Sequence, residues 1–199
     1  MNNTIKLVAL GLSLLLASVS VCYAQDFEKG FNAYNSGDYA TALREWRSLA
    51  DQGDADAQYN LGLMYANGQG VIQDYKEAVR LYGQAAAQGN ASAQSNLGLM
   101  YNNGEGVIQD YKEAVRLYSL AAAQGYATAQ HNLGVKYYNG EGVIQDNVYA
   151  HMWWNIAASS GDASAVKNRD IVAGKMTASD ISKAQELARE CVKKEYKGC

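Results

Sequence analysis

Residues 93–128 read AQSNLGLMYNNGEGVIQDYKEAVRLYSLAAAQGYAT and form one unit of a repeated sequence. Nearly the same sequence precedes them at 57–92 (AQYNLGLMYANGQGVIQDYKEAVRLYGQAAAQGNAS). A more divergent copy follows at 129–164 (AQHNLGVKYYNGEGVIQDNVYAHMWWNIAASSGDAS). A fixed period of about 20–50 residues is typical of a stacked repeat array. Because such arrays mostly present extended surfaces, we expect a binding protein and not an enzyme.

Each repeat predicts two short helices. The first covers 57–67 and is broken by Gly68, since glycine adopts backbone angles that other residues avoid. The second covers 75–88, where Asp74 at the N-cap and Glu77 three residues later predict a capping box. Helices of this length are marginal alone, so the pairs must stack on one another. The predicted fold is all-α, an α-solenoid of antiparallel helix pairs with capping helices at its ends.

Small and aromatic residues recur at fixed places and predict the packing. Glycines 36 residues apart let two helices approach closely, and large aromatic side chains on both helices of each repeat fill the space between helices. These positions are Gly62, Gly98 and Gly134; Tyr65, Tyr101 and Tyr137; and Tyr82, Tyr118 and Trp154. Most of the 15 tyrosines are therefore expected in the core and not in a ligand site.

The pattern A-x-x-x-L-G-x-x-Y-x-x-G-x-G-V-x-x-D-Y-x-x-A-x-x-x-Y-x-x-A-A-x-x-G resembles the Sel1-like repeat, a relative of the tetratricopeptide repeat with a longer loop. The resemblance covers nearly all of the chain after residue 26. It implies the fold, and it leaves the function open among adaptors, periplasmic regulators, invasion-related factors and toxin-neutralising proteins.

The ends of the array differ from its middle. Residues 27–56 are interpreted as a tetratricopeptide-like first repeat, in which Trp46 takes the place of Tyr82. Repeats at 57–92, 93–128 and 129–164 follow. Residues 165–199 are expected to form C-terminal capping helices, with Thr177 and Asp180 in a further capping box.

The first 24 residues predict a secretory signal, with Lys6, an apolar run LVALGLSLLLA and cleavage after Ala24. A lipoprotein cleaved before Cys22 is the alternative. We therefore expect a periplasmic or secreted protein without a membrane span. A net charge of −3 gives no indication of nucleic-acid binding.

Two cysteines remain after cleavage, Cys191 and Cys199. An even pair in an oxidising compartment usually bonds, so we expect a disulfide between them. A redox-active pair is the alternative, although the spacing is not C-x-x-C.

Few residues suit catalysis. The chain has two histidines, His131 and His151, and no H-E-x-x-H or G-x-S-x-G motif. The glycine loops lack the preceding strand that a phosphate cradle needs, so they are interpreted as turns. We expect no catalytic residues, no cofactor and no metal.

By analogy with tetratricopeptide stacking, the first helices are expected to line a concave groove that binds a partner. The candidate residues are the first-helix positions that vary between repeats: Tyr59, Leu63, Ala66 and Asn67; Ser95, Leu99, Asn102 and Asn103; His131, Val135, Tyr138 and Asn139; and Tyr34 from the first repeat. Asparagines at 67, 103 and 139 either grip a peptide backbone or only end the first helices. The aromatic candidates are the stronger ones, because aromatic contacts bury area with little entropy loss.

The function predicted from these features is a monomeric interaction module, an adaptor or regulator, that binds a protein or peptide in its groove. An immunity protein that neutralises a secreted toxin is an alternative within the same class. Outside it stand an enzyme acting on cell-wall or β-lactam substrates and a structural protein of the envelope.

Overall fold

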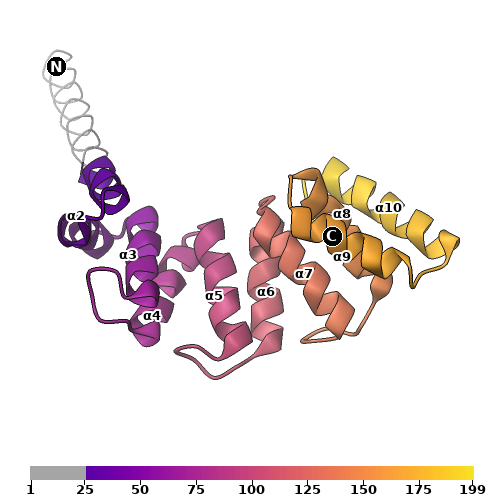
Figure 1. Ribbon diagram of the computed structural model, residues 1–199, viewed down its shortest axis with the longest axis horizontal. Coiled ribbons are helices and arrows are strands. Elements are labelled where there is room, and N and C mark those ends of the chain that lie inside the picture. Colours follow the sequence, from indigo (N-terminus) through magenta and orange to yellow (C-terminus); the bar gives the residue numbers. More distant parts are fainter. Residues whose placement is uncertain (1–25) are drawn as a thin grey trace, which may run out of the picture.

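The computed structural model describes residues 26–199, and all regular structure in that range is helical (Figure 1). Residues 26–35 are helical and are followed by α2 (Tyr39–Asp51), α3 (Ala55–Asn67), α4 (Tyr75–Ala87), α5 (Ala91–Asn103), α6 (Tyr111–Ala122), α7 (Ala127–Asn139), α8 (Asn147–Ser159), α9 (Ala163–Ala173) and α10 (Ala178–Lys193). The expected signal at 1–24, with its alternative at Cys22, lies outside the described residues. The all-α prediction is confirmed.

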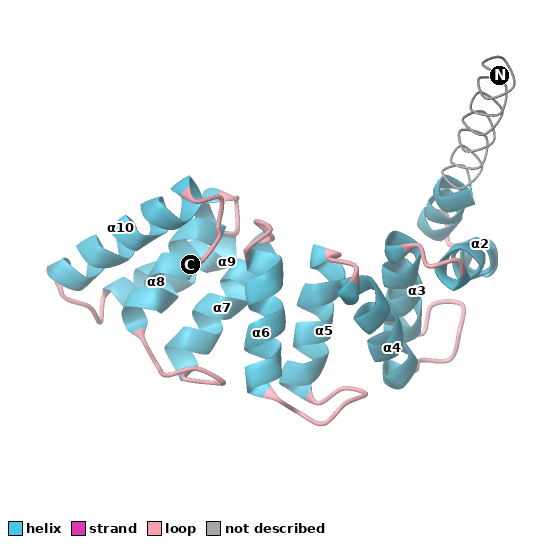
Figure 2. Ribbon diagram, turned by 180° about the vertical axis from the view of Figure 1, so that it is seen from behind, coloured by secondary structure: helices cyan, strands magenta, loops and turns pink. Residues whose placement is uncertain are grey.

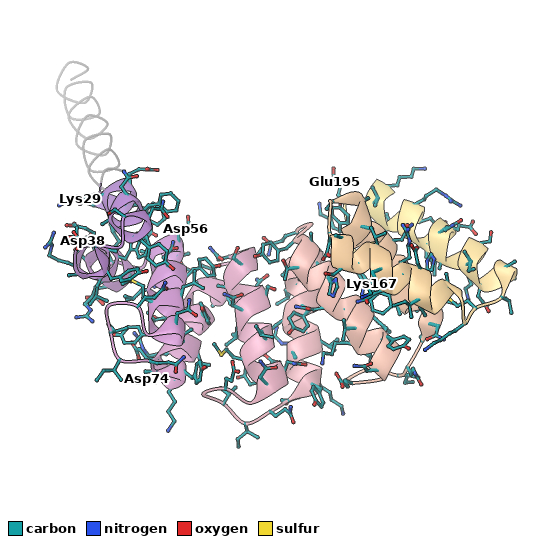
Figure 3. The ribbon with its side chains drawn as sticks, in the orientation of Figure 1. Lys29, Asp38, Asp56, Asp74, Lys167 and Glu195 are labelled. Carbon is teal, nitrogen blue, oxygen red and sulfur yellow. A yellow bond between two sulfur atoms is a disulfide. The ribbon has the colours of Figure 1, made fainter. Side chains whose placement is uncertain are left out.

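The helices form antiparallel pairs that stack side by side into a curved array (Figures 1 and 2). The closest neighbours are α3 with α4, α5 with α6, and α7 with α8. Asp56 in the first turn of α3 and Asp74 at the start of α4 lie at opposite ends of their pair (Figure 3). The long loops 68–74, 104–110 and 140–146 therefore all emerge on one edge of the array.

Glycines end the first helices. The C-caps of α3, α5 and α7 have left-handed φ values of 67°, 72° and 74°, which a residue with a side chain rarely adopts. These C-caps are Gly68, Gly104 and Gly140. The chain thus leaves each first helix in the same direction and crosses to the second helix along the same path.

Aspartates start the second helices. The Asp74 carboxylate accepts hydrogen bonds from the amides of Lys76 and Glu77, and Asp110 and Asp146 do the same in the next repeats. The reciprocal half of the predicted capping box is wrong. The Asp74 amide donates to the Tyr65 carbonyl at 2.9 Å, while Glu77 pairs with Arg80 at 2.6 Å. The amide of Asp74, which Glu77 would bind in a full capping box, is therefore already bonded to the first helix.

Buried aromatic rings lie directly on the helix glycines. Tyr82, Tyr118 and Trp154 are almost fully buried, and a Cβ on the facing Gly62, Gly98 or Gly134 would lie within 2.8 Å of the ring. Trp46 stands in the same relation to Gly30, at 2.6 Å. The ring needs the missing side chain, which explains why glycine and aromatic residue repeat together.

Glutamines link one repeat to the next. Buried Gln58 and Gln94 donate to carbonyls at the end of the preceding second helix, those of Ala50 and Ala86. Their own side-chain oxygens accept a hydrogen bond at 2.8 Å from a glutamine 30 residues later, Gln88 and Gln124 respectively. Gln130 likewise donates to the carbonyl of Ala122. The residue 30 positions later is Ser160 and not a glutamine, so Oε1 of Gln130 has no hydrogen-bond partner.

The C-terminal cap packs on α8. Both α9 and α10 contact α8, and α10 buries Ala184, Ala188 and Cys191. The Sγ atoms of Cys191 and Cys199 lie at bonding distance, 2.04 Å. The tail after α10 consequently folds back over α8 towards the turn between α6 and α7.

Candidate protein-interaction surface

We call the partly exposed side chains at the varying positions of α3, α5 and α7, together with Tyr34 of the helix at 26–35, the first-helix surface. Three apolar side chains hold the same place on successive helices: Leu63, Leu99 and Val135. Leu99 is 43% exposed, and the other two are half-buried against the aromatic packing of their repeats. An apolar row therefore runs across three repeats.

The tyrosine candidates are held by the buried aromatic of their own repeat. Ring centroids lie 5.9 Å apart for Tyr59 and Tyr82 and 5.7 Å apart for Tyr138 and Trp154. Tyr34 of the first repeat lies 5.4 Å from its own buried indole, that of Trp46, and donates a 2.7 Å hydrogen bond to Gln69. Each ring is fixed on one side and half-exposed on the other, a preorganised contact that costs little entropy on binding.

Burial has an electrostatic effect on Tyr59. Desolvation raises the pKa of its hydroxyl above the ordinary value, opposed by hydrogen bonds to Ser92 and Asn96. Tyr59 is therefore neutral in the physiological range and presents an apolar ring with a hydrogen-bonding tip.

An open pocket of about 310 Å³ lies at the C-terminal end of this surface. Val135, Tyr138, Trp154, Asn168 and Ile171 line it, so it is bounded by α7, α8 and α9. The Lys175 ammonium lies 4.9 Å from the Tyr138 ring centroid and also contacts its hydroxyl. This is an apolar hollow with a positive charge at its edge.

Two candidates do not reach the surface as expected. Ser95 is only 2% exposed, because its short side chain stays within the helix packing, so we leave it out of the surface. Ala66, at 9%, is also buried.

His131 is half-buried, and its Nδ1 lies 3.1 Å from Oδ2 of Asp162, the N-cap of α9. Its imidazole thus belongs to the junction with the cap as much as to the surface.

The asparagines at the ends of the first helices are exposed but bonded locally. The Asn67 amide donates to Gln69 at 3.4 Å, and Asn103 donates to Glu105 at 3.3 Å. Asn139 makes the corresponding contact with Glu141. Of the two interpretations of these asparagines, these local contacts favour a role at the helix end over one in binding.

A buried lysine escaped the sequence interpretation. Lys136, 4% exposed, stands where the earlier repeats have methionine. Its ammonium contacts Asn102 Oδ1 and Glu141 Oε2 and lies 4.6 Å from the Tyr111 ring centroid. The contact with Lys136 holds the pKa of the Glu141 carboxyl below its usual value. The side-chain oxygen of Asn102 is therefore already bonded to a residue of the next repeat. The sequence signal for this buried lysine is a charged residue at the repeat position that methionine holds in the two preceding repeats, as Met64 and Met100.

Within residues 26–199, His, Cys, Asp and Glu side chains form no group of three that could hold a metal ion. In the same range, no helix combines the length and the apolar character needed to cross a bilayer.

The fold and the surface together define a class: a helical-repeat solenoid whose first helices present a row of aromatic and apolar side chains. The Sel1 repeat sequence model matches residues 55–90, 91–126 and 127–162, more than half of the chain. The protein belongs to the Sel1 repeat family. Sel1 repeats generally mediate protein–protein interaction, and the family is typically a non-enzymatic scaffold. The matched repeats begin two residues before the starts at 57, 93 and 129 and have the same 36-residue period.

Solved structures agree with this assignment. The protective antigen c5321 of uropathogenic Escherichia coli, which displays an SLR fold, is similar with a TM-score of 0.62 and 27% identity over 87% of this chain. The chain spans 47% of that antigen's length. A Sel1 repeat protein from Oxalobacter formigenes has a TM-score of 0.59 and 40% identity, covering 65% of this chain and 97% of its own. No curated protein matches the sequence significantly.

Proposed function

We propose that this protein is a periplasmic or secreted interaction module that docks a protein partner on its first-helix surface. One observation carries the proposal: the groove-facing positions of the first helices differ between repeats, while the opening stretch of the second helix is identical in the first two of the three repeats. Position 66 is alanine, and the same position is asparagine at 102 and tyrosine at 138, while DYKEAVRLY is repeated without change at 74–82 and 110–118. A surface that recognises one partner needs different side chains along its length, whereas a supporting surface can be copied.

The geometry supports the same surface. Tyr34, Tyr59 and Tyr138 are rigid, half-exposed rings at successive places along the array, and Leu99 lies uncovered between the last two. Aromatic side chains held in place are typical of interface hot spots. The pocket beside Tyr138 offers a place for one apolar side chain of the partner.

The proposed location rests on the first 24 residues and on the cysteine pair. A signal segment directs export, and an oxidising compartment would retain the bond for which Cys191 and Cys199 are placed. Cell fractionation, followed by intact mass of the purified protein after alkylation without reductant, tests both. A cytosolic protein with two alkylated thiols would contradict the proposal.

The binding test starts from a partner captured on the purified protein from envelope extract and measures its affinity by calorimetry. Tyr59→Ala and Tyr138→Ala are each expected to weaken binding by about 1–2 kcal/mol. Lys76→Ala and Lys112→Ala, on exposed second-helix positions, are the matched controls and should change it little. The reverse ranking would place the partner on the second helices and remove the proposed role of the first-helix surface.

A further inference from the structure

A groove separates the second helices α4 and α6. Each of these helices packs mainly on the first helices beside it, α3 and α5 for α4, and α5 and α7 for α6. The space between them is an open hollow of about 390 Å³. Its lining is mostly small or apolar and includes Gly83, Ala87, Gly89, Leu97, Leu117 and Leu120. We call it the α4/α6 groove. It lies apart from the first-helix surface, and none of the proposed partner-binding residues lines it.

One repeat later the equivalent groove is occupied by the chain itself. Ser119, Ala123, Leu133 and Trp153 stand 36 residues after Gly83, Ala87, Leu97 and Leu117, and they share a cavity wall with Tyr196, Gly198 and Cys199 of the C-terminal tail. The tail thus lies in the second-helix groove of the following repeat.

The tyrosine of the tail packs on the glycine of the turn between α6 and α7. A Cβ on Gly125 would lie 3.1 Å from the Tyr196 ring, so the ring packs on bare backbone. The equivalent glycine of the α4/α6 groove, Gly89, has nothing within 4 Å of the same point. The α4/α6 groove therefore has the same floor for an aromatic ring but no ring on it.

An exposed leucine marks the empty groove. Leu120 is 42% exposed and replaces the polar Gln84 of the preceding repeat. Its counterpart in α8, Ile156, is 1% exposed and belongs to one buried cluster with Ala188 and Cys191 of α10. The C-terminal segment therefore covers the apolar side chain at this position of α8, whereas the equivalent side chain of α6 stays exposed.

We propose that the α4/α6 groove binds a tight-turn segment of a partner protein that inserts an aromatic side chain against Gly89, as the chain's own tail does against Gly125. The tail of a second copy is not the occupant, because Cys191 and Cys199 close it in the groove of its own molecule. This site does not depend on the first-helix surface, so either can fail without the other.

The probe is the oxidised cyclic peptide CVKKEYKGC, which is residues 191–199 of this chain. Fluorescence anisotropy with the labelled peptide should show saturable binding to the purified protein. The peptide carrying Tyr196→Ala should bind at least about tenfold more weakly, since the ring fills the groove. In the protein, Leu120→Glu should cause a loss of the same size.

Leu99→Glu is the matched control, because Leu99 and Leu120 are exposed to 43% and 42% but lie on different surfaces. It should leave peptide binding unchanged. Gly83→Leu provides a second groove variant, since a Cβ there meets nothing within 4 Å and the added side chain fills the hollow. It should weaken binding at least about tenfold. If circular dichroism shows that Leu120→Glu has not folded, peptide binding to Gly83→Leu tests the groove in its place.

Four results would overturn the proposal. The peptide fails to bind, or it binds a folded groove variant as well as the parent protein, or Leu99→Glu weakens it as much as Leu120→Glu does. A concentration-dependent dimer that Leu120→Glu abolishes in sedimentation experiments would assign the groove to a second copy and would also overturn it.

Discussion

The Tyr118 ring lies so close to Gly98 that a Cβ on this glycine would stand 2.8 Å from ring atom Cε1. The two residues come from α5 and α6, and the contact joins the helices of one pair. Tyr118 is buried to 1% exposure. The glycine is therefore required by packing and not by backbone conformation, since its φ is helical.

Gly98→Ala is expected to lower the free energy of unfolding by about 1–2 kcal/mol, because overpacking outweighs the helix propensity that alanine adds. Gly83→Ala, in α4 with open space around its Cβ, is the matched control and should raise stability by about 0.5–1 kcal/mol. Urea denaturation measures both. Equal signs for the two variants would show that the ring contact does not limit Gly98.

Ser160→Gln should complete the glutamine links between repeats. Gln88 and Gln124 each bond to the buried glutamine 30 residues earlier, whereas Gln130 keeps an unpaired Oε1. We expect a gain of about 0.5–1.5 kcal/mol in the free energy of unfolding. Thermal denaturation of Ser160→Gln in the Gln130→Leu background gives the control, in which the gain should disappear. A gain of equal size in both backgrounds would point to a cause outside this hydrogen bond.

Replacing Lys136 with Met, the residue of the earlier repeats, should leave stability unchanged or raise it by up to about 2 kcal/mol. The substitution removes a buried charge, and the carboxylate of Glu141, one-third exposed, keeps its contact with water. Glu141→Gln should instead cost about 1–3 kcal/mol, since it leaves the buried ammonium without its counter-charge. Chemical denaturation at neutral pH compares the two variants. The prediction fails if Lys136→Met is the more damaging of the pair.

His151 predicts a pH dependence of stability. Burial lowers the pKa of its imidazole below the ordinary 6.5, Arg169 adds to the effect and Asp170 opposes it. The unfolded chain therefore takes up the proton first. Stability is fully present above about pH 6.5 and declines as the pH falls from there towards the lower pKa of the folded state.

His151→Leu removes this titration, and the Nδ1 that it deletes has no hydrogen-bond partner. Urea midpoints measured at pH 7.5 and pH 5.5 should fall less in the variant than in the parent protein. An equal fall in both proteins would mean that His151 does not govern the acid sensitivity.

The exposure of several candidate residues followed from the repeat alignment. That of Leu99, Tyr59 and Tyr138 could be predicted because exposure on a helix follows its period. Ser95 was misjudged because its short side chain stays within the helix packing. Asn102 was misjudged because another repeat binds it: Lys136, which contacts Asn102, stands 34 residues further along the chain. A single-helix pattern contains no information on the neighbour that will lie against it.

The 36-residue period, the helix ends at Gly68 and Asp74, and the recurrence of a glycine at 98 and an aromatic residue at 118 can all be recognised in the sequence. These features are local or are repeated within one unit, so hydrogen bonding and steric fit specify them wherever the unit stands. The burial of Lys136 and the position of Tyr196 in the groove of an earlier repeat, in contrast, appear only in the folded chain. Those contacts join residues far apart in the chain, and their energies depend on how the stacked repeats and the folded-back tail come together in space.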